Sequence, residues 1–199
     1  MRKLAVAAFF CLYALQAGAQ PAAQPLRLRA TVQSVDATSM TVKERSGEVL
    51  QLALDDKLTV SEVLPIELSA LKAGAYVGTA AMPRPDGTLE ALEVLVFPES
   101  ARGTGEGHRP WDLQPGSTMT NATVADLAAA PQGRRLTLTY KDGAKTLIVP
   151  EGVPVVTFKP ADRSLLVPGA KVIVTAELRD GRPTALRVLA GRDGFAPPL

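Results

Sequence analysis

The sequence predicts an all-β fold made of two tandem small β-barrels, or of one pseudo-symmetric double barrel. Three observations predict it. Apolar and polar residues alternate over short segments, Gly-containing turn signals separate these segments, and one pattern occurs twice along the chain. No window has the period of a long amphipathic helix. Closing strands into barrels removes the exposed edges that would otherwise invite aggregation.

The repeated pattern covers residues 69–97 and 163–191. In both copies a Leu-x-x-Gly-Ala-x-Val segment precedes an Asp-Gly turn, and an Ala-Leu-x-Val-Leu segment follows it. The openings of the two halves match more weakly, ATVQSVD at 30–36 against ATVADLA at 122–128. We therefore expect one duplicated module, and the alternative is coincidence between two generic hairpins.

Each half is expected to begin with a hairpin. Apolar residues alternate with polar ones in SMTVKER (39–45) and RRLTLTYK (134–141), as in strands with one buried face. Asp142-Gly143 favours the positive backbone angles of a tight turn, and Ser46-Gly47 occupies the matching place. The partner strands are EVLQLAL (48–54) and AKTLIVP (144–150).

Each half is expected to end with a second hairpin, closed at Asp86-Gly87 or Asp180-Gly181. The preceding Leu-x-x-Gly segments are expected to form single helical turns that end at Gly74 and Gly169, because glycine tolerates the left-handed conformation found there. NATVADLAAA (121–130) is the best candidate for a helix, but its β-branched start and its match to the first half favour a strand.

The first 19 residues, MRKLAVAAFFCLYALQAGA, have the pattern of an export signal. A positive start, an apolar run and the small residues Ala17-Gly18-Ala19 follow one another, so cleavage is expected after Ala19. The apolar run is shorter than the roughly 20 residues of a membrane span. The alternative of an uncleaved anchor lacks a stop-transfer pattern. We therefore expect a periplasmic protein without a transmembrane segment after cleavage.

Cleavage changes the composition that matters for function. It removes Cys11, the only cysteine, together with Arg2 and Lys3, which leaves 20 basic against 20 acidic residues. The mature chain would then depend on its apolar core without disulfides, although its compartment is oxidising. A net charge near zero and few aromatic residues argue against a nucleic-acid partner. No cofactor is expected.

Three stretches of the chain resemble a group of exported proteobacterial proteins: VKERSGEVLQLAL with LSALKAGAYVGTAAMPRPDGTLEALEVLVFPE, RGTGEGHRPWDLQPGSTMTNATV, and VPVVTFKPADRSLLVPGAKVIVTA. The resemblance spans about residues 28 to 199, and 102–124 is its most specific part. It implies tandem OB-like β-barrel domains of unknown function and supplies no catalytic residues. Some of the group carry a metal-transport permease label, but a permease needs several membrane spans.

The resulting organisation has six parts, and its connecting segment is named the strap. They are a signal peptide at 1–19, a disordered N-terminus at 20–27, a first barrel at 28–97, the strap at 98–117, a second barrel at 118–191 and a C-terminal tail at 192–199. Phe195 in the tail is expected either to pack back onto the second barrel or to face a partner.

The candidate functional residues lie in GTGEGHRPWDLQPGSTMTN (103–121), which holds the only histidine and the only tryptophan. Arg109, Trp111 and Asp112 are the candidate binding residues. Trp111 offers the largest apolar area of the segment, so it is expected either to anchor the two modules or to line a binding surface. Glu106, His108 and Asp112 are the alternative candidates for a metal site, although one histidine without cysteine makes a poor closed zinc site.

An enzyme is not expected. Ser117 lies outside a Gly-x-Ser-x-Gly nucleophile elbow, and GTGEGHR lacks the Lys-Ser/Thr ending of a phosphate-binding loop. The leading hypothesis is a non-enzymatic periplasmic binding or scaffold protein, whose small ligand or protein partner meets the groove between the modules. The alternative is a metal-handling accessory protein or metalloenzyme that uses Glu106, His108 and Asp112, and a hydrolase is a third possibility.

Overall fold

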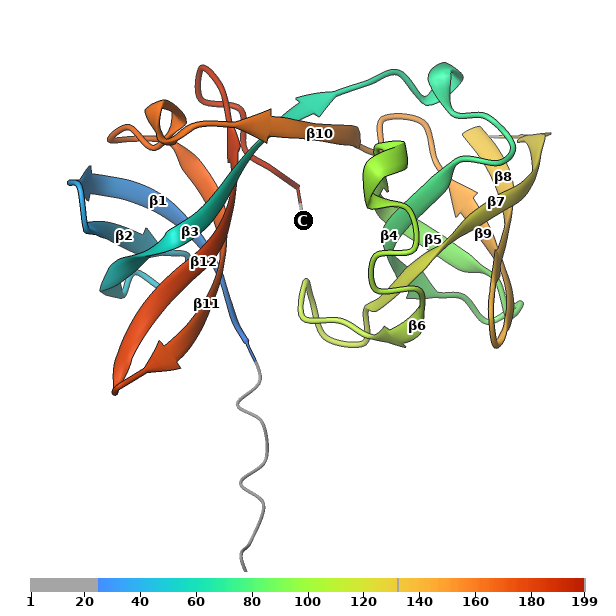
Figure 1. Cartoon of the computed structure of the whole chain (residues 1–199). Coiled ribbons are helices and arrows are strands. Elements are labelled where there is room, and N and C mark those ends of the chain that lie inside the picture. Colours follow the sequence, from blue (N-terminus) through green and yellow to red (C-terminus); the bar gives the residue numbers. More distant parts are fainter. Residues whose placement is uncertain (1–24, 132, 199) are drawn as a thin grey trace, which may run out of the picture.

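The computed structural model describes residues 25–131 and 133–198, and within these ranges it contains strands and short 3₁₀ turns but no α-helix (Figure 1). The predicted all-β class is therefore confirmed. Across these same ranges, no helix has the length and apolar character needed to cross a bilayer. The predicted signal peptide and its cleavage site lie outside the described residues.

The strands follow the predicted hairpins closely, and the segment 121–130 lies in a strand, as expected. β1 begins at Leu26, so Leu26 and Arg27 belong to a strand and not to the predicted disordered N-terminus. The strands are β1 (Leu26–Val35), β2 (Ser39–Glu44), β3 (Val49–Pro65), β4 (Tyr76–Pro83), β5 (Leu89–Val96), β6 (Gly107–Pro110), β7 (Thr118–Ala130), β8 (Gly133–Tyr140), β9 (Gly143–Val149), β10 (Val155–Ala161), β11 (Lys171–Arg179) and β12 (Arg182–Gly191), and the 3₁₀ turns are η1 (Leu68–Ala70), η2 (Glu99–Ala101) and η3 (Arg163–Leu165).

Five strands form a closed barrel, named here the first barrel. β12, β11, β1, β2 and β3 pair in that order with antiparallel neighbours, and β12 returns to β3 in a parallel pairing. Alternate residues of each strand face the inside, and Met40, Val42 and Leu52 are fully buried there. Leu166, which follows η3, packs into the same core.

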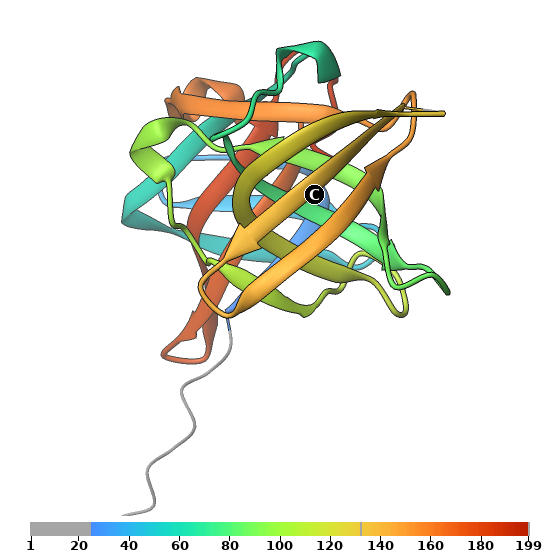
Figure 2. The same ribbon diagram turned by 90° about the vertical axis from the view of Figure 1, so that its right-hand side faces the viewer.

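Five further strands, β5, β4, β7, β8 and β9, pair in this order and are named here the second strand group. β9 returns to β5 over only two residue pairs, Leu89 with Leu147 and Glu90 with Ile148. Figure 2 shows β7, β8 and β9 in front of β4 and β5. The enclosed side chains form a second buried cluster, which includes Val77, Leu136 and Leu138.

The strands are grouped differently from the predicted division at 28–97 and 118–191. The first barrel takes its last hairpin, β11–β12, from the C-terminal half, and the hairpin β4–β5 joins the second strand group. The physical reason lies in β3, which pairs with both β12 and β10 from Val60 to Val63 and with β10 alone at Leu64 and Pro65. β10 spans the two sides of the molecule (Figure 1). The chain therefore leaves the first barrel at the end of β3, after an irregularity at residues 55–58 in its pairing with β12.

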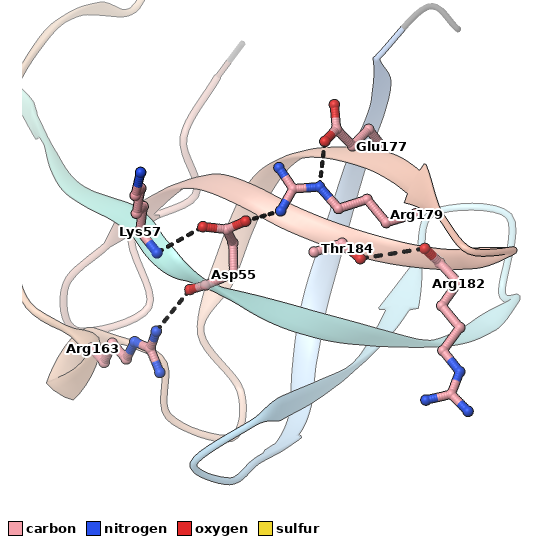
Figure 3. A network of polar contacts seen from close by, with 7 residues as sticks. All are labelled: Asp55, Lys57, Arg163, Glu177, Arg179, Arg182 and Thr184. Carbon is pink, nitrogen blue, oxygen red and sulfur yellow. Dashed lines mark hydrogen bonds and ion pairs between the residues drawn. The ribbon is translucent and has the colours of Figure 1, made fainter.

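A polar network fixes the first barrel where β3 meets the hairpin β11–β12 (Figure 3). The Asp55 carboxylate pairs with the guanidinium of Arg179 and accepts a hydrogen bond from the backbone N–H of Lys57 at 2.6 Å. Arg179 also pairs with Glu177, and Arg163 of η3 donates to the Asp55 carbonyl at 3.0 Å. Residues more than a hundred positions apart thus hold the barrel closed.

The C-terminal tail returns toward the middle of the molecule, so Phe195 packs back instead of facing outward. Its ring lies against a buried apolar cluster that includes Val63 and Ile173. Arg192 donates two hydrogen bonds to the buried carboxylate of Glu62, at 2.9 and 3.1 Å. These contacts lower the pKa of Glu62 and attach the tail to β3.

The place of the hairpin β11–β12 in the first barrel can be tested with engineered cysteines. Thr31 of β1 and Lys171 of β11 are directly paired, and the Lys171 ammonium contacts the Thr31 hydroxyl at 2.9 Å. Paired antiparallel residues have Cα atoms about 4.5–5.5 Å apart, which suits a disulfide. The double variant T31C/K171C of the chain from Gln20 is therefore expected to oxidise within one molecule, as measured by free-thiol titration and non-reducing gel mobility.

The matched control is T31C/A75C. In the first copy of the repeat, Tyr76 corresponds to Lys171, and Ala75 is the residue before it. Ala75 pairs instead with Val124 of the second strand group. Oxidation of the control pair, with free thiols in T31C/K171C, would contradict this place of the hairpin.

Candidate functional site

A groove lies between the first barrel and the second strand group. Its volume is about 610 Å³. Strands β1, β3, β11 and β12 form one wall, β4, β5 and β7 form the other, and β10 and the strap complete it. The residues that line it are Arg27, Leu58, Thr59, Val60, Ser61, Gly78, Leu95, Phe97, Ala101, Thr104, Gly105, Arg109, Trp111, Met119, Asn121, Phe158, Pro160, Ala161, Ile173, Thr175, Arg187 and Leu189.

Aromatic and aliphatic side chains form the deep part of the groove. The rings of Phe97 and Phe158 meet edge to face with centroids 5.9 Å apart, and Tyr76 contacts Phe97 at 5.2 Å. Leu95 and Ile173 belong to the buried cluster that connects the two sides. These residues face out of their own strand groups, so alternation along the strands supplies both the two inner cores and this shared apolar surface.

The strap (98–117) is an ordered part of the second strand group. It forms η2 and the short strand β6, which pairs with β7 from Gly107 opposite Asn121 to Pro110 opposite Thr118. The Asn121 amide donates to the Thr104 carbonyl at 2.9 Å, and the Tyr76 hydroxyl donates to the same oxygen at 3.1 Å. The strap therefore lies along the rim of the groove, fixed by β4 and β7.

Glycine is required where β4 faces this anchor. A Cβ atom at Gly78 would lie 2.8 Å from the Asn121 Oδ1 atom and 3.0 Å from the Phe97 ring. The absence of a side chain on β4 thus leaves the space in which Asn121 holds the strap.

The strap also reaches across to β1 of the first barrel. The guanidinium of Arg27 lies 4.3 Å from the centroid of the Trp111 ring, and that of Arg109 lies 5.6 Å from it. Asp112 accepts two hydrogen bonds from Arg29, at 3.0 and 3.1 Å. The hydrogen bonds from Arg29 hold the pKa of Asp112 below its ordinary value.

The three candidate binding residues, Arg109, Trp111 and Asp112, therefore come together at the rim. Trp111 contacts Arg27 of β1 and also lines the groove. Arg27 and Arg29 were not among the candidate residues. Their alternation with buried Leu28 and Ala30 was a usable indication that both point out of the barrel on one face.

The three candidate metal ligands, in contrast, have separate partners. Glu106 accepts from the backbone N–H of Lys141 at 3.0 Å, and His108 Nδ1 lies 2.8 Å from the Thr120 hydroxyl. Burial, Lys145 and Arg109 lower the pKa of His108. Asp112 is paired with Arg29, and residues 25–131 and 133–198 contain no cluster of three potential metal ligands. The structure does not bring Glu106, His108 and Asp112 into one site.

Glu93 of β5 is a buried carboxyl group that sequence reasoning missed. Its exposed fraction is 0%, and neither carboxyl oxygen has a hydrogen-bond partner in the described part of the chain. Burial raises its pKa to about 8, against the opposing charges of Arg29 and Arg27. An irregularity between Ala80 and Ala81 shifts the pairing of β4 with β5, so Glu93 lies opposite Ala80. A charged residue inside the apolar run ALEVLVF was the only indication.

Comparison of the chain with protein-family models, with curated proteins and with solved structures gave no match.

Glu93 predicts an unusual dependence of stability on pH. Because its pKa is raised from 4.5 to about 8, the folded protein holds a proton that the unfolded chain releases between these values. The contribution of Glu93 to the free energy of unfolding therefore falls as pH rises through this window. The isosteric variant E93Q has no such titration.

The measurement is urea unfolding of both proteins between about pH 5 and pH 9. E93Q is expected to gain stability relative to the wild type as pH rises. His108 titrates in both proteins, so its contribution cancels in the difference. Parallel stability profiles would show that Glu93 is not held protonated.

The ion pair between Asp112 and Arg29 predicts a measurable contribution to the attachment of the strap. Arg29 is 11% exposed and Asp112 is 50% exposed. D112N is expected to lower the free energy of unfolding by about 1 kcal/mol, as for a partly exposed bidentate pair. It should also shift Trp111 emission to longer wavelength. The control is D126N, since Asp126 is exposed on β7 and has no such pair. Equal behaviour of the two variants would contradict this role.

Proposed function

We propose that this chain is a non-enzymatic periplasmic binding protein whose small organic ligand occupies the groove. The groove itself carries the proposal: its volume of about 610 Å³ falls within the roughly 300–1,000 Å³ typical of small-molecule sites. Aromatic and aliphatic side chains form most of its lining, with a few polar groups at the rim, as in such sites.

The side chains of the groove support binding better than catalysis. Hydroxyl groups of Thr59, Ser61 and Thr175 and the arginines at the rim offer hydrogen bonds to a ligand. The lining residues include no carboxylate, histidine, lysine or cysteine, so they supply no general acid and base pair. His108, the only histidine, lies on the other side of β6 against Thr120.

We further propose that the first barrel and the second strand group are two copies of one OB-like module with exchanged hairpins. Equivalent residues of the repeat support this, because Ala30 pairs with Val172 in one group and Ala122 with Val77 in the other. The register irregularities also recur, after Val32 in the first barrel and after Val124 in the second group.

The backbone contacts before each exchanged hairpin repeat in the same way. The N–H of Gly169 donates to the Val32 carbonyl at 2.8 Å, and that of Gly74 donates to the Val124 carbonyl at 2.8 Å. Both glycines have positive φ, +89° and +83°, as predicted. The predicted helical turns over the Leu-x-x-Gly segments are not formed, because η1 and η3 end at Ala70 and Leu165, before these segments begin. Exchange of the hairpins then fixes the walls of the groove relative to each other, which reduces the ordering cost of binding.

Ligand binding in the groove can be tested with the neutral apolar dye N-phenyl-1-naphthylamine. Trp111 lines the groove and is the only tryptophan, so a bound dye is expected to quench its emission and to fluoresce by energy transfer. Thr59 of β3 lines the groove beside Arg187, its partner on the neighbouring strand β12. T59F places an aromatic ring there and should weaken dye binding at least about tenfold by steric exclusion.

The matched control is T139F, because Thr139 is exposed on β8 and does not line the groove. T139F should bind the dye as the wild type does. Absence of dye binding to the wild type, or equal binding to T59F and T139F, would refute the groove as the binding site.

A further inference from the structure

The charged residues of the groove all have the same sign. Among the residues that the structure describes, Arg27, Arg109 and Arg187 line it, and no acidic side chain does. Because the mature chain has equal numbers of basic and acidic residues, this composition is a local feature of the groove. The three arginines come from β1, β6 and β12, so the fold brings them together from distant parts of the sequence.

The guanidinium groups retain hydrogen-bonding capacity. Arg27 and Arg187 form no salt bridge within the described ranges, and Arg109 donates to the Gly105 carbonyl at 2.8 Å. Each guanidinium has five N–H donors, so several remain for a ligand. Burial is the main cause that lowers the pKa of Arg27, and an anion beside it would offset this loss of hydration.

Asp112 and Glu93 are the acidic residues whose charges favour the ionised form of Arg27, but burial outweighs them and the pKa of Arg27 stays lowered. Asp112 is already paired with Arg29, which belongs to β1 but does not line the groove. Glu93 is buried, with a pKa of about 8, and is therefore mostly protonated at neutral pH. A ligand anion would meet the positive charge of the rim with little competition from the protein.

The apolar side of the groove lies next to these cations. Phe97 and Phe158 stack edge to face, and Leu95, Ile173 and Leu189 extend this surface. A ligand that satisfies both sides needs an apolar body and an anionic head. Trp111 lies at the junction, between the guanidinium groups of Arg27 and Arg109.

We propose that the groove binds a small amphipathic organic anion. Its apolar body lies against Phe97, Phe158 and Ile173, and its carboxylate, phosphate or sulfonate head accepts hydrogen bonds from Arg27, Arg109 and Arg187. This inference rests on the proposed function and specifies its ligand class. A free molecule fits better than a lipid surface, because the large exposed apolar residues Leu26, Val49, Val167 and Leu178 lie outside the groove.

The test compares laurate with the uncharged alcohol of the same chain length, both below micelle formation, by displacement of N-phenyl-1-naphthylamine. Wild-type protein is expected to bind laurate at least about tenfold more tightly than the alcohol, through charge-assisted hydrogen bonds. Added salt should weaken laurate binding and leave alcohol binding nearly unchanged.

Arg187 provides the cleanest variant, because it is exposed and its replacement does not disturb the strap. R187Q is expected to weaken laurate binding roughly three- to tenfold and to leave alcohol binding unchanged, whereas R187K retains most of the affinity for laurate. The matched control is R135Q, since Arg135 is exposed on β8 outside the groove. It should behave as the wild type in both assays.

The outcomes separate this inference from the proposed function. Dye binding with equal affinity for laurate and the alcohol, unchanged in R187Q, would overturn the anionic ligand and keep the groove as a binding site. Failure of the dye and of both competitors to bind would overturn both proposals. Co-sedimentation with phosphatidylglycerol vesicles, without binding of free laurate, would replace the small ligand by a lipid surface.

Discussion

The antiparallel pairing of β3 with β10 is the interaction on which the rest of the structure depends. β3 first serves as a barrel strand, paired with β2 and β12, and then continues as a partner of β10. β10 in turn pairs with β5 in a parallel register. Because this crossing keeps the chain extended, the set of β1, β2 and β3 pairs with the hairpin β11–β12, and the set of β7, β8 and β9 pairs with the hairpin β4–β5. Neither side then has a complete sheet without the other, which makes folding strongly non-local.

The crossing also explains why a groove exists. It holds two strand groups side by side, so their outward faces share one buried cluster and enclose the groove beside it. The strap completes this arrangement at the rim, where Trp111 and Asp112 reach Arg27 and Arg29. These contacts differ in kind, since one is a cation–π contact and the other a bidentate ion pair, but both depend on the fixed direction of β1. The attachment is therefore a property of the whole fold.

Local features could be predicted from the sequence because local chemistry decides them. Alternation gave the strands, Asp-Gly and Ser-Gly gave the hairpins, and Leu-x-x-Gly gave the positive φ of Gly74 and Gly169. The grouping of strands could not be predicted, because the hairpins β4–β5 and β11–β12 have the same sequence pattern and the pattern does not say which strands each one joins. The choice depends on β3, which continues for seventeen residues through Asp55-Asp56, a pair that is typical of turns.

The candidate site was predictable in part for the same reason. The unusual composition of 103–121 pointed to Arg109, Trp111 and Asp112, whereas the partners of Trp111 and Asp112 come from β1 and require tertiary structure. Proximity in sequence misled for Glu106 and His108. These two residues are near each other along the chain, but one bonds to Lys141 and the other to Thr120. Glu93 was hidden because a shift in register, which the sequence does not show, decides the side it faces.

Glu93 lowers the stability of the fold and also affects the charge near the groove. A buried carboxyl group without a hydrogen bond destabilises the protein by roughly 1–3 kcal/mol. Within the described part of the chain, the buried atoms Trp111 Nε1 and Asn121 Oδ1 also have no hydrogen-bond partner. Such departures from the usual satisfaction of buried polar groups concentrate at functional sites. At Glu93 the departure has a consequence for recognition. Because a protonated carboxyl group carries no charge, it leaves the field of the nearby arginines intact at neutral pH. A solvent-exposed glutamate at the same place would be ionised and would compete with an anionic ligand for those guanidinium groups.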